Sequence, residues 1–308
     1  MRAFITGITG FLGSNLAKAL DCPTVGLVRD CYNFISAGMK NEQIPPATLC
    51  FGDLADIGSL ERIIAEHRID TVFHLAAQTE VFVGSKDPIG TFEANVRGTW
   101  NLLEACRRQG VGRVIVASSD KAYGRSKPPY REDQPLLPDR PYETSKACVD
   151  LIAATYASTY RMSIATTRCV NLYGPGCMSL STLVPNTIRR VIRGERPFMR
   201  NGGTMKRDWL YIEDAVDAYI KLAKSKYVGA MNFGGGEGVE VKQVIAMILF
   251  LMGSNLTATD EEDKHGEILD QWADSSLAKK VLEWEPNHSL AEGLKKTIEW
   301  YTNYFRAA

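Results

Sequence analysis

The chain has 308 residues, 45% of them hydrophobic, which is enough to bury the core of one large or two modest domains. Its 36 Lys and Arg residues balance 36 Asp and Glu residues, which argues against nucleic acid or an anionic membrane as a partner and favours a small molecule. Seven scattered cysteines without a CxxC pair are typical of a reducing compartment, and no apolar run reaches the roughly 20 residues of a membrane span. We therefore expect a soluble, cytoplasmic protein.

Short apolar runs alternate along the chain with segments whose apolar residues recur at helical spacing. The expected strands are residues 3–6, 24–28, 47–51, 71–76, 113–118 and 163–170. The expected helices are residues 11–20, 56–67, 87–110, 145–160 and 290–305. This alternation predicts an α/β fold with a doubly wound parallel sheet that is covered on both faces.

The strict alternation ends near residue 170, where prolines and loop-like stretches begin. We expect residues 1–170 to form the sheet domain, together with a return segment near residues 208–230. Residues 171–308 are expected to form mainly a smaller C-terminal α/β domain that binds the substrate.

Gly7, Gly10 and Gly13 lie in "TGITGFLG", between the first expected strand and the first expected helix. Glycine at such positions lets the backbone turn tightly and approach a pyrophosphate, whose charge a helix N-terminus stabilises. A plain strand-to-helix turn is the alternative. The position of the motif in the first βα unit favours a dinucleotide site.

The second expected strand ends in "GLVRD", which bears on the type of dinucleotide. Arg29 would pair with the 2'-phosphate of NADP, whereas Asp30 would accept hydrogen bonds from the ribose of NAD. Asp53, in "FGDLAD", would suit the adenine amino group or serve as a helix cap. The choice between NAD and NADP stays open.

Tyr142 and Lys146 lie one helical turn apart in "YETSK". Both side chains are therefore expected on one helix face, where the ammonium would lower the pKa of the phenol. A surface pair is the alternative. Beside a nicotinamide, this Tyr would take a proton from a hydroxyl group while hydride leaves the same carbon.

Ser119, Asp120 and Lys121 follow the strand "RVIVAS" directly. Since strands of a doubly wound sheet end at the ligand crevice, these three groups are expected to face the substrate, although a polar loop would show the same residues. Arg207 in "KRDWLYIEDA" is suited to a diphosphate, with a surface salt bridge to Asp208 as the alternative. No ligand spacing connects the four histidines, so we expect no metal.

These motifs together resemble the extended short-chain dehydrogenase/reductase family of nucleotide-sugar epimerases and dehydratases. The resemblance covers nearly the whole chain and includes "FHLAAQ", "ANVRGTWNLLEA", "RCVNLYGPG", "NFGGGEG" and "DSSLAKKVLEWEP". It implies a Rossmann domain for NAD(P), a C-terminal domain for a nucleoside-diphosphate sugar, and a homodimer packed through helices near residues 92–109 and 142–158.

The resemblance also implies contacts for individual residues. The implied cofactor contacts are Gly7, Thr9, Gly10, Phe11, Leu12, Arg29, Asp53, Leu54, Leu75, Ala76, Ala77, Tyr142 and Lys146, with His74 at the border of the cofactor. The implied substrate contacts are Gln78, Asn95, Asn171 and Arg207.

Within this family, the residues after the strand separate the reactions. Epimerases carry small or apolar residues where this chain has Asp120 and Lys121, whereas the Ser119-Asp120-Lys121 trio looks like the CDP-glucose 4,6-dehydratases. The resemblance thus implies a dehydratase that forms a 4-keto-6-deoxy sugar nucleotide and regenerates a tightly bound NAD or NADP in each cycle. The nucleobase, the sugar and any inversion at C5 stay open, since "GLVRD" looks more like the GDP-mannose dehydratases.

Three alternatives remain at this stage. A 4-epimerase shares every motif except the Asp-Lys pair, and a sugar-nucleotide reductase would consume NADPH. A non-catalytic cofactor-binding protein is disfavoured, because such a protein has no use for Ser119, Tyr142 and Lys146.

Overall fold

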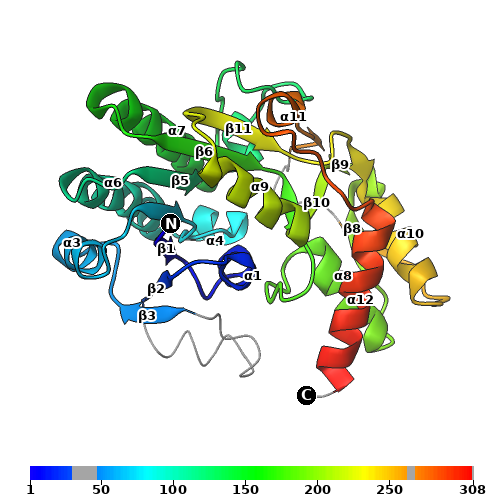
Figure 1. Ribbon diagram of the computed structural model, residues 1–308. Helices are drawn as coiled ribbons and strands as arrows, with labels where there is room; N and C mark the ends of the chain where they lie inside the picture. Colours follow the sequence, from blue (N-terminus) through cyan, green and yellow to red (C-terminus); the bar gives the residue numbers. More distant parts are fainter. Residues whose placement is uncertain (30–46, 262–267, 307–308) are drawn as a thin grey trace.

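The central feature of the molecule is a parallel sheet, seen in a computed structural model that describes residues 1–29, 47–261 and 268–306 (Figure 1). Within these ranges, seven strands form this sheet in the order β11-β6-β5-β4-β1-β2-β3, and every neighbouring pair is parallel. They are β1 (Ala3–Thr6), β2 (Thr24–Val28), β3 (Thr48–Phe51), β4 (Thr71–His74), β5 (Arg113–Ala117), β6 (Ile164–Cys169) and β11 (Gly229–Phe233). The order runs outward in both directions from β1 and β4, so the sheet has the expected doubly wound, Rossmann-like topology.

Helices cover both faces of this sheet (Figure 1). The helices α3 (Ile57–Glu66), α6 (Gly98–Arg108) and α7 (Pro141–Tyr160) pack side by side on one face. On the other face lie α1 (Phe11–Ala19) and α9 (Ile212–Lys224), which contact each other. Parallel strands buried in this way carry apolar residues on both faces, as the continuous apolar runs in the sequence predicted.

The helix α3 shows how the local sequence produces such an element. Asp56 precedes it and accepts a hydrogen bond from the backbone N–H of Ser59 at 3.1 Å, which satisfies one of the free donors of the first turn. Leu60, Ile63 and Ile64 then recur at helical spacing and are all buried against the sheet.

The single helix expected at residues 87–110 is interrupted in the structure. It consists of α5 (Pro88–Phe92), a π-helical turn at Glu93–Arg97 and α6, and the unpredicted helix α4 (Val81–Lys86) precedes it. A π turn accommodates one extra residue per turn and often accompanies a functional site. Here it directs the buried side chain of Asn95 to the loop after β4, a contact that helical periodicity cannot predict.

The C-terminal part of the chain adds smaller sheets and further helices. Its strands are β7 (Asn171–Tyr173) with β10 (Trp209–Tyr211), β8 (Phe198–Arg200) with β13 (Thr259–Glu261), and β9 (Lys206–Arg207) between β12 (Val239–Glu240) and β14 (Asp270–Gln271). Its helices besides α9 are α8 (Leu183–Ile192), α10 (Val241–Leu251), α11 (Ser276–Leu282) and α12 (Leu290–Arg306). Strand β11 shows that the chain returns to the large sheet as far as residue 233, beyond the expected segment at 208–230.

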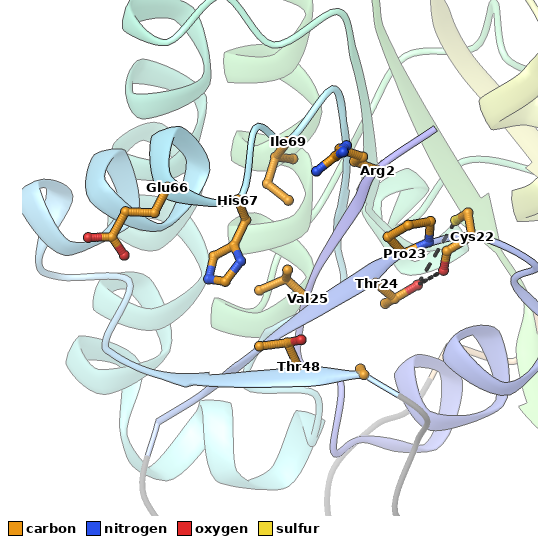
Figure 2. A pocket seen from close by; sticks show the side chains of 10 residues that line it. Arg2, Cys22, Pro23, Thr24, Val25, Thr48, Glu66, His67 and Ile69 are labelled. Atoms are coloured by element: carbon orange, nitrogen blue, oxygen red, sulfur yellow. Dashed lines mark hydrogen bonds between the residues drawn. The ribbon is translucent and has the colours of Figure 1, made fainter.

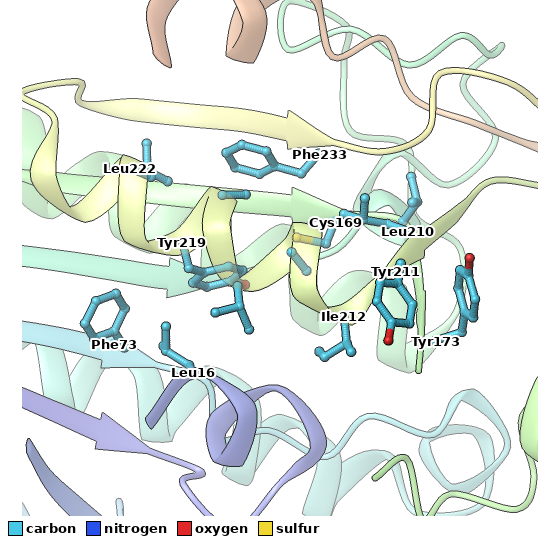
Figure 3. Packing of buried hydrophobic residues seen from close by; sticks show 14 of the residues in the cluster. Leu16, Phe73, Cys169, Tyr173, Leu210, Tyr211, Ile212, Tyr219, Leu222 and Phe233 are labelled. Carbon is cyan, nitrogen blue, oxygen red and sulfur yellow. The ribbon is translucent and has the colours of Figure 1, made fainter. Parts of the chain in front are cut away.

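One large apolar cluster connects the sheet to the C-terminal elements. Figure 3 shows Tyr219 of α9 above Leu16 and Phe73, with Tyr211 at the end of β10. The Tyr219 hydroxyl lies 2.6 Å from that of Thr167, so its polar end is satisfied while its ring is buried. Each fully buried large side chain contributes about 1.5–3 kcal/mol, and this shared core holds the walls of the site described below in place. Within the described ranges, no helix has both the length and the apolar composition needed to cross a membrane.

Candidate active site

A cavity of about 1940 Å³ opens at the carboxyl ends of the sheet strands, where the strand order reverses between β1 and β4. Its wall contains the residues predicted for the cofactor, substrate and catalytic sites, and among those that the structure describes Asn95 and His74 are the exceptions. The wall extends from the turn after β1 to residues of the C-terminal part, among them Asn171 and Arg207. Residues scattered over most of the sequence thus meet around one space.

A second hollow of about 420 Å³ lies at the opposite end of the sheet (Figure 2). Its wall includes Arg2 before β1, Thr24 at the start of β2, Thr48 at the start of β3, and His67 after α3. No residue of this wall was predicted as part of a site. This hollow therefore contains none of the residues for which the sequence predicts chemistry.

The glycine turn after β1 allows the protein backbone to approach a ligand closely. Gly7 has a φ of +75°, and a Cβ at this position would lie 2.7 Å from the backbone nitrogen of Ala76. A Cβ at Gly13 would collide with the carbonyl oxygen of Gly7. Helix α1 begins directly after Gly10 without a side-chain cap, so its first N–H groups point to the cavity as a cradle for phosphate. The cradle fits the pyrophosphate of a dinucleotide.

The end expected to hold the ribose and adenine is lined by Arg29 and Asp53. The Asp53 carboxylate accepts a hydrogen bond from the Ala55 N–H at 2.8 Å, whereas Asp56 is the cap of α3, so Asp53 does not cap that helix. Asp30 lies outside the described residues. The choice between NAD and NADP therefore stays open here as well.

Tyr142 and Lys146 lie in the first turns of α7, as predicted, and both are buried in the cavity wall. Burial lowers the pKa of Lys146 to about 8, and its ammonium group donates to the Ala117 carbonyl at 2.9 Å. Burial also raises the pKa of Tyr142 well above its usual value, and a hydrogen bond with Ser119 opposes that rise. Ser119 therefore lowers the pKa of the phenol, and the expected effect of the Lys146 ammonium stays a prediction.

Ser119, Asp120 and Lys121 begin a 3-10 turn directly after β5. The Ser119 hydroxyl accepts from the Lys121 N–H at 3.2 Å and donates to Asp120 Oδ1 at 3.1 Å, and this cap directs the next two side chains into the cavity. Asp120 is 2% exposed, and its Oδ2 has no hydrogen-bond partner. Lys121 Nζ donates to Gln271 Oε1 at 3.1 Å. The three side chains predicted at this strand end thus line the same cavity as Tyr142.

The predicted substrate contacts divide into two groups. Gln78, Asn171 and Arg207 line the cavity, and Arg207 donates to the carbonyl oxygens of Lys206 and Leu269. These contacts with fixed backbone atoms hold the guanidinium group of Arg207 in place.

Asn95 does not reach the cavity, contrary to the expectation of a substrate contact. It is 1% exposed, accepts from the Gln78 N–H at 2.7 Å and donates to the Gln78 carbonyl at 2.9 Å and to Ser145 Oγ at 2.9 Å. These bonds place it behind the wall, where it positions the Gln78 loop against α7.

His74 is also absent from the cavity wall. Its Nδ1 lies 2.8 Å from Thr6 Oγ1, and its Nε2 lies 2.9 Å from Thr99 Oγ1. Since Thr99 donates its own proton to the Asn95 carbonyl, His74 must donate from Nε2 and accept at Nδ1. Burial, with Lys146 nearby, lowers its pKa to about 3, so this histidine is a neutral part of the support behind the cofactor cradle.

The polar residues of the wall that the sequence analysis missed include Gln271 and Glu143. Gln271 in β14 is 1% exposed and leaves its Nε2 without a partner, and Glu143 follows Tyr142 directly and is 3% exposed. Glu143 is the second residue of "YETSK", so a search for ionisable residues within this motif would have found it. Gln271 carries no local signal, because it reaches Lys121 from 150 residues away.

Comparisons with known proteins agree with this geometry. The model of the NAD dependent epimerase/dehydratase family matches residues 3–234. A dTDP-glucose 4,6-dehydratase of Mycolicibacterium smegmatis is 31% identical over 312 residues, covering 98% of this chain and 93% of its own. A UDP-glucuronate 4-epimerase of Thermodesulfobacterium geofontis is 30% identical over 310 residues, covering 96% of this chain and 94% of its own.

A solved structure is also similar to this chain over nearly its whole length. The crystal structure of UDP-glucose 4-epimerase from Thermotoga maritima, with UDP-glucose, has a TM-score of 0.93 and 28% identity, and the match covers 99% of this chain and 100% of the other. Similarity of this extent, with the glycine cradle and the Ser-Tyr-Lys group in one cavity, shows that the chain belongs to the NAD-dependent epimerase/dehydratase family.

Proposed function

We propose that this chain is a nucleotide-sugar 4,6-dehydratase that converts CDP-glucose, UDP-N-acetylglucosamine or a GDP-sugar to the 4-keto-6-deoxy sugar nucleotide. The observation that carries the proposal is the presence of Asp120 and Lys121 in the cavity that also contains Tyr142. Epimerisation at C4 needs proton transfer at one hydroxyl group only. Loss of water across C5 and C6 needs a further base and a further acid, and these two residues supply them.

The cofactor is NAD or NADP, held tightly at the glycine cradle and regenerated in each cycle. When bound, it supplies the acceptor and donor of hydride. The backbone at Gly7 and Gly10 and the N-terminus of α1 bind the pyrophosphate, and Arg29 and Asp53 lie at the adenosine end.

Oxidation at C4 begins with a proton transfer to Tyr142. Because burial raises the pKa of the phenol, its deprotonated form needs stabilisation by hydrogen bonds and by a nearby cation. Ser119 supplies a hydrogen bond to the phenol. Lys146 supplies the cation, and its ammonium group has three N–H donors, one of which bonds the Ala117 carbonyl.

Elimination follows from the acidity of the C5 proton beside the new C4 ketone. Neutral Lys121 takes this proton, the C5–H electrons form the C5=C6 double bond, and the C6–O bond breaks as protonated Asp120 gives its proton to the leaving hydroxyl. With the cofactor bound, C6 would regain the hydride taken from C4 while Lys121 returns its proton to C5, which completes the 4-keto-6-deoxy sugar. Ser119 bonds both Tyr142 and Asp120, so the proton that Tyr142 took from C4 can restore the acid at Asp120.

Residues 171–308 supply most of the nucleotide-sugar site in this proposal. Arg207 is buried, lines the cavity and carries a planar cation that matches diphosphate oxygens, and Asn171 and Trp209 lie in the same part of the wall.

The deciding experiment is incubation of the purified protein with CDP-glucose, UDP-N-acetylglucosamine, GDP-mannose and UDP-glucose, followed by mass spectrometry. Loss of one water from one of these substrates, without added cofactor, is the expected result and identifies the sugar nucleotide. Turnover that leaves the mass of every substrate unchanged would refute the dehydratase.

A 4-epimerase is the second candidate, and the similarity to the Thermotoga maritima epimerase favours it. In that case the mass is unchanged and nuclear magnetic resonance shows inversion at C4. Asp120 and Lys121 would then have no part in proton transfer.

We also propose a homodimer packed through residues 92–109 and 142–158. Three large apolar side chains in these ranges are exposed in the single chain, Phe92 at 37%, Trp100 at 44% and Leu151 at 64%. Exposed apolar groups of this size on adjacent helices are typical of an interface. Light scattering should show a dimer for the wild type and a monomer for Leu151→Glu.

A further inference from the structure

Among the ionisable groups of the cavity wall that have no role in the reaction proposed above, Glu143 is a buried one. Glu143 is the residue after Tyr142, is 3% exposed and lines the same cavity. A carboxyl group buried to this degree requires a partner or a proton.

The partner of Glu143 is a second carboxyl group. Glu143 and Asp139 form a side-chain hydrogen bond, and the Asp139 N–H lies 3.5 Å from Glu143 Oε2. A hydrogen bond between two carboxyl groups requires one proton, because ionised carboxylates only accept. The exposed Arg125 forms an ion pair with Asp139, whose side chain is 32% exposed, so the pair extends from the cavity towards the surface.

The surroundings decide where this proton lies. Burial, with the Asp139 side chain, raises the pKa of Glu143 to about 7, and Lys121 opposes that rise. Burial also acts on Asp139, but Arg125 and the hydrogen bond from Glu143 lower its pKa overall, with Arg140 contributing. The proton therefore belongs to Glu143.

The other groups around Glu143 come from different elements. Lys121 belongs to the 3-10 turn after β5, Asp139 and Arg140 to the segment that enters α7, and Tyr130, whose pKa Glu143 helps to raise, to the loop between them. Of these groups, Lys121 lies in the cavity wall with a role in the reaction.

A helix-capping role does not account for Glu143. It is the third residue of α7, where an acid usually accepts backbone N–H groups in its ionised form and in contact with water. Here the side chain is buried, and its backbone contact at 3.5 Å is at the outer limit of a hydrogen bond.

We propose that Glu143 and Asp139 share one proton and that the gain or loss of this proton controls the charge of Lys121 in the cavity. While the pair holds the proton, Lys121 faces a neutral Glu143 and loses its own proton more readily. When the pair releases it, an anion forms beside Lys121 and stabilises the ammonium. Glu143 is thus a positioning residue for the proposed base, and this inference rests on the proposed function for the use of Lys121.

The test is the chemical reactivity of Lys121, which depends on its neutral fraction and requires no sugar nucleotide. Wild type, Glu143→Gln and Asp139→Asn are treated with trace acetic anhydride over a pH series, and acylation of Lys121 is quantified by mass spectrometry of its peptide. The exposed Lys280 serves as the internal reference.

Opposite shifts are expected for the two variants. Glu143→Gln cannot form the anion, so Lys121 should react roughly tenfold faster than in wild type at about pH 8, corresponding to a change of about one pKa unit. Asp139→Asn removes the like charge that raises the pKa of Glu143, so the anion forms at lower pH and Lys121 should react more slowly at about pH 6.5. Lys280 should be unchanged in both.

Equal Lys121 profiles in wild type and either folded variant overturn the proposal. If Glu143→Gln does not fold, Asp139→Asn provides the same test from the partly exposed side of the pair. Infrared spectra of the wild type provide another, since the carbonyl band of a protonated carboxyl group should disappear near neutral pH, and a band absent at all pH values also overturns the proposal. A shift in Lys121 reactivity without loss of water from any sugar nucleotide would instead refute the dehydratase and leave the pair intact.

Discussion

The polar groups behind the end of β5 and those in front of it differ in their hydrogen bonds. Behind it, the buried Asp150 accepts from Ser118 Oγ and from Arg168 Nε at 3.1 Å, and Arg168 also donates to Tyr123 at 2.8 Å. In front of it, polar atoms that line the cavity lack partners. They are Asp120 Oδ2, Gln271 Nε2, Trp209 Nε1 and Gln78 Oε1.

This difference distinguishes polar groups that stabilise the fold from polar groups that are expected to bind a ligand. A buried polar group without a partner costs about 1–3 kcal/mol, so a group of such atoms around one cavity is expected only where a ligand completes them. The satisfied network behind β5 holds α7 and β5 in place. Substitutions of the groups in front of the end of β5 should therefore remove activity without loss of stability. Substitutions of the groups behind it should lower stability.

The largest effect is expected for Tyr142→Phe. It removes the proton acceptor for C4 and leaves the ring in place, so turnover of the sugar nucleotide should fall by about 10²–10⁴-fold. The melting temperature should change little. A variant that retained more than a tenth of the wild-type rate would place the proton transfer elsewhere.

Arg168→Met tests the group behind β5. It leaves the buried carboxylate of Asp150 without its cation, which should lower the free energy of unfolding by about 3–5 kcal/mol. Urea denaturation measures this loss. Asp133→Asn serves as the matched control, because its exposed pair with Arg131 should contribute less than about 1 kcal/mol. Equal losses in the two variants would contradict the division between support and function.

Asp120→Asn tests the proposed acid, which belongs to the groups in front of the end of β5. The amide cannot supply the proton for the C6 hydroxyl, so loss of water should slow by about 100-fold. Because the replaced carboxylate has an unpartnered oxygen, unfolding in urea should show no loss of stability. If this variant dehydrates at the wild-type rate, Asp120 is not the acid.

His74 provides the smallest of these effects, through pH. Its pKa in the folded chain is about 3, below the value of about 6.5 expected in the unfolded chain, so the unfolded state binds the extra proton. Stability is thus fully present above about pH 6.5 and is lost as the pH falls towards 3, by about 2 kcal/mol at pH 5. Urea denaturation at about pH 6.5 and at about pH 5 measures this loss of stability. In His74→Gln the free energy of unfolding should lack this part of its pH dependence.

The sequence by itself determined the elements and motifs that depend on neighbouring residues. The strand and helix alternation, the turn at Gly7 and the one-turn spacing of Tyr142 and Lys146 are local, because periodicity and backbone geometry act over a few residues. Parallel strands place their carboxyl ends at one edge, so the meeting of these motifs in one cavity followed as well.

Only the tertiary structure decided the contacts that join distant segments. Lys121 meets Gln271 across 150 residues, and Asn95, together with His74, lies behind the wall because a π turn and two threonine contacts hold these side chains there. The state of Glu143 also depends on burial and on the neighbouring carboxyl group of Asp139. Burial and electrostatic fields are properties of the packed molecule, and no short stretch of sequence contains them.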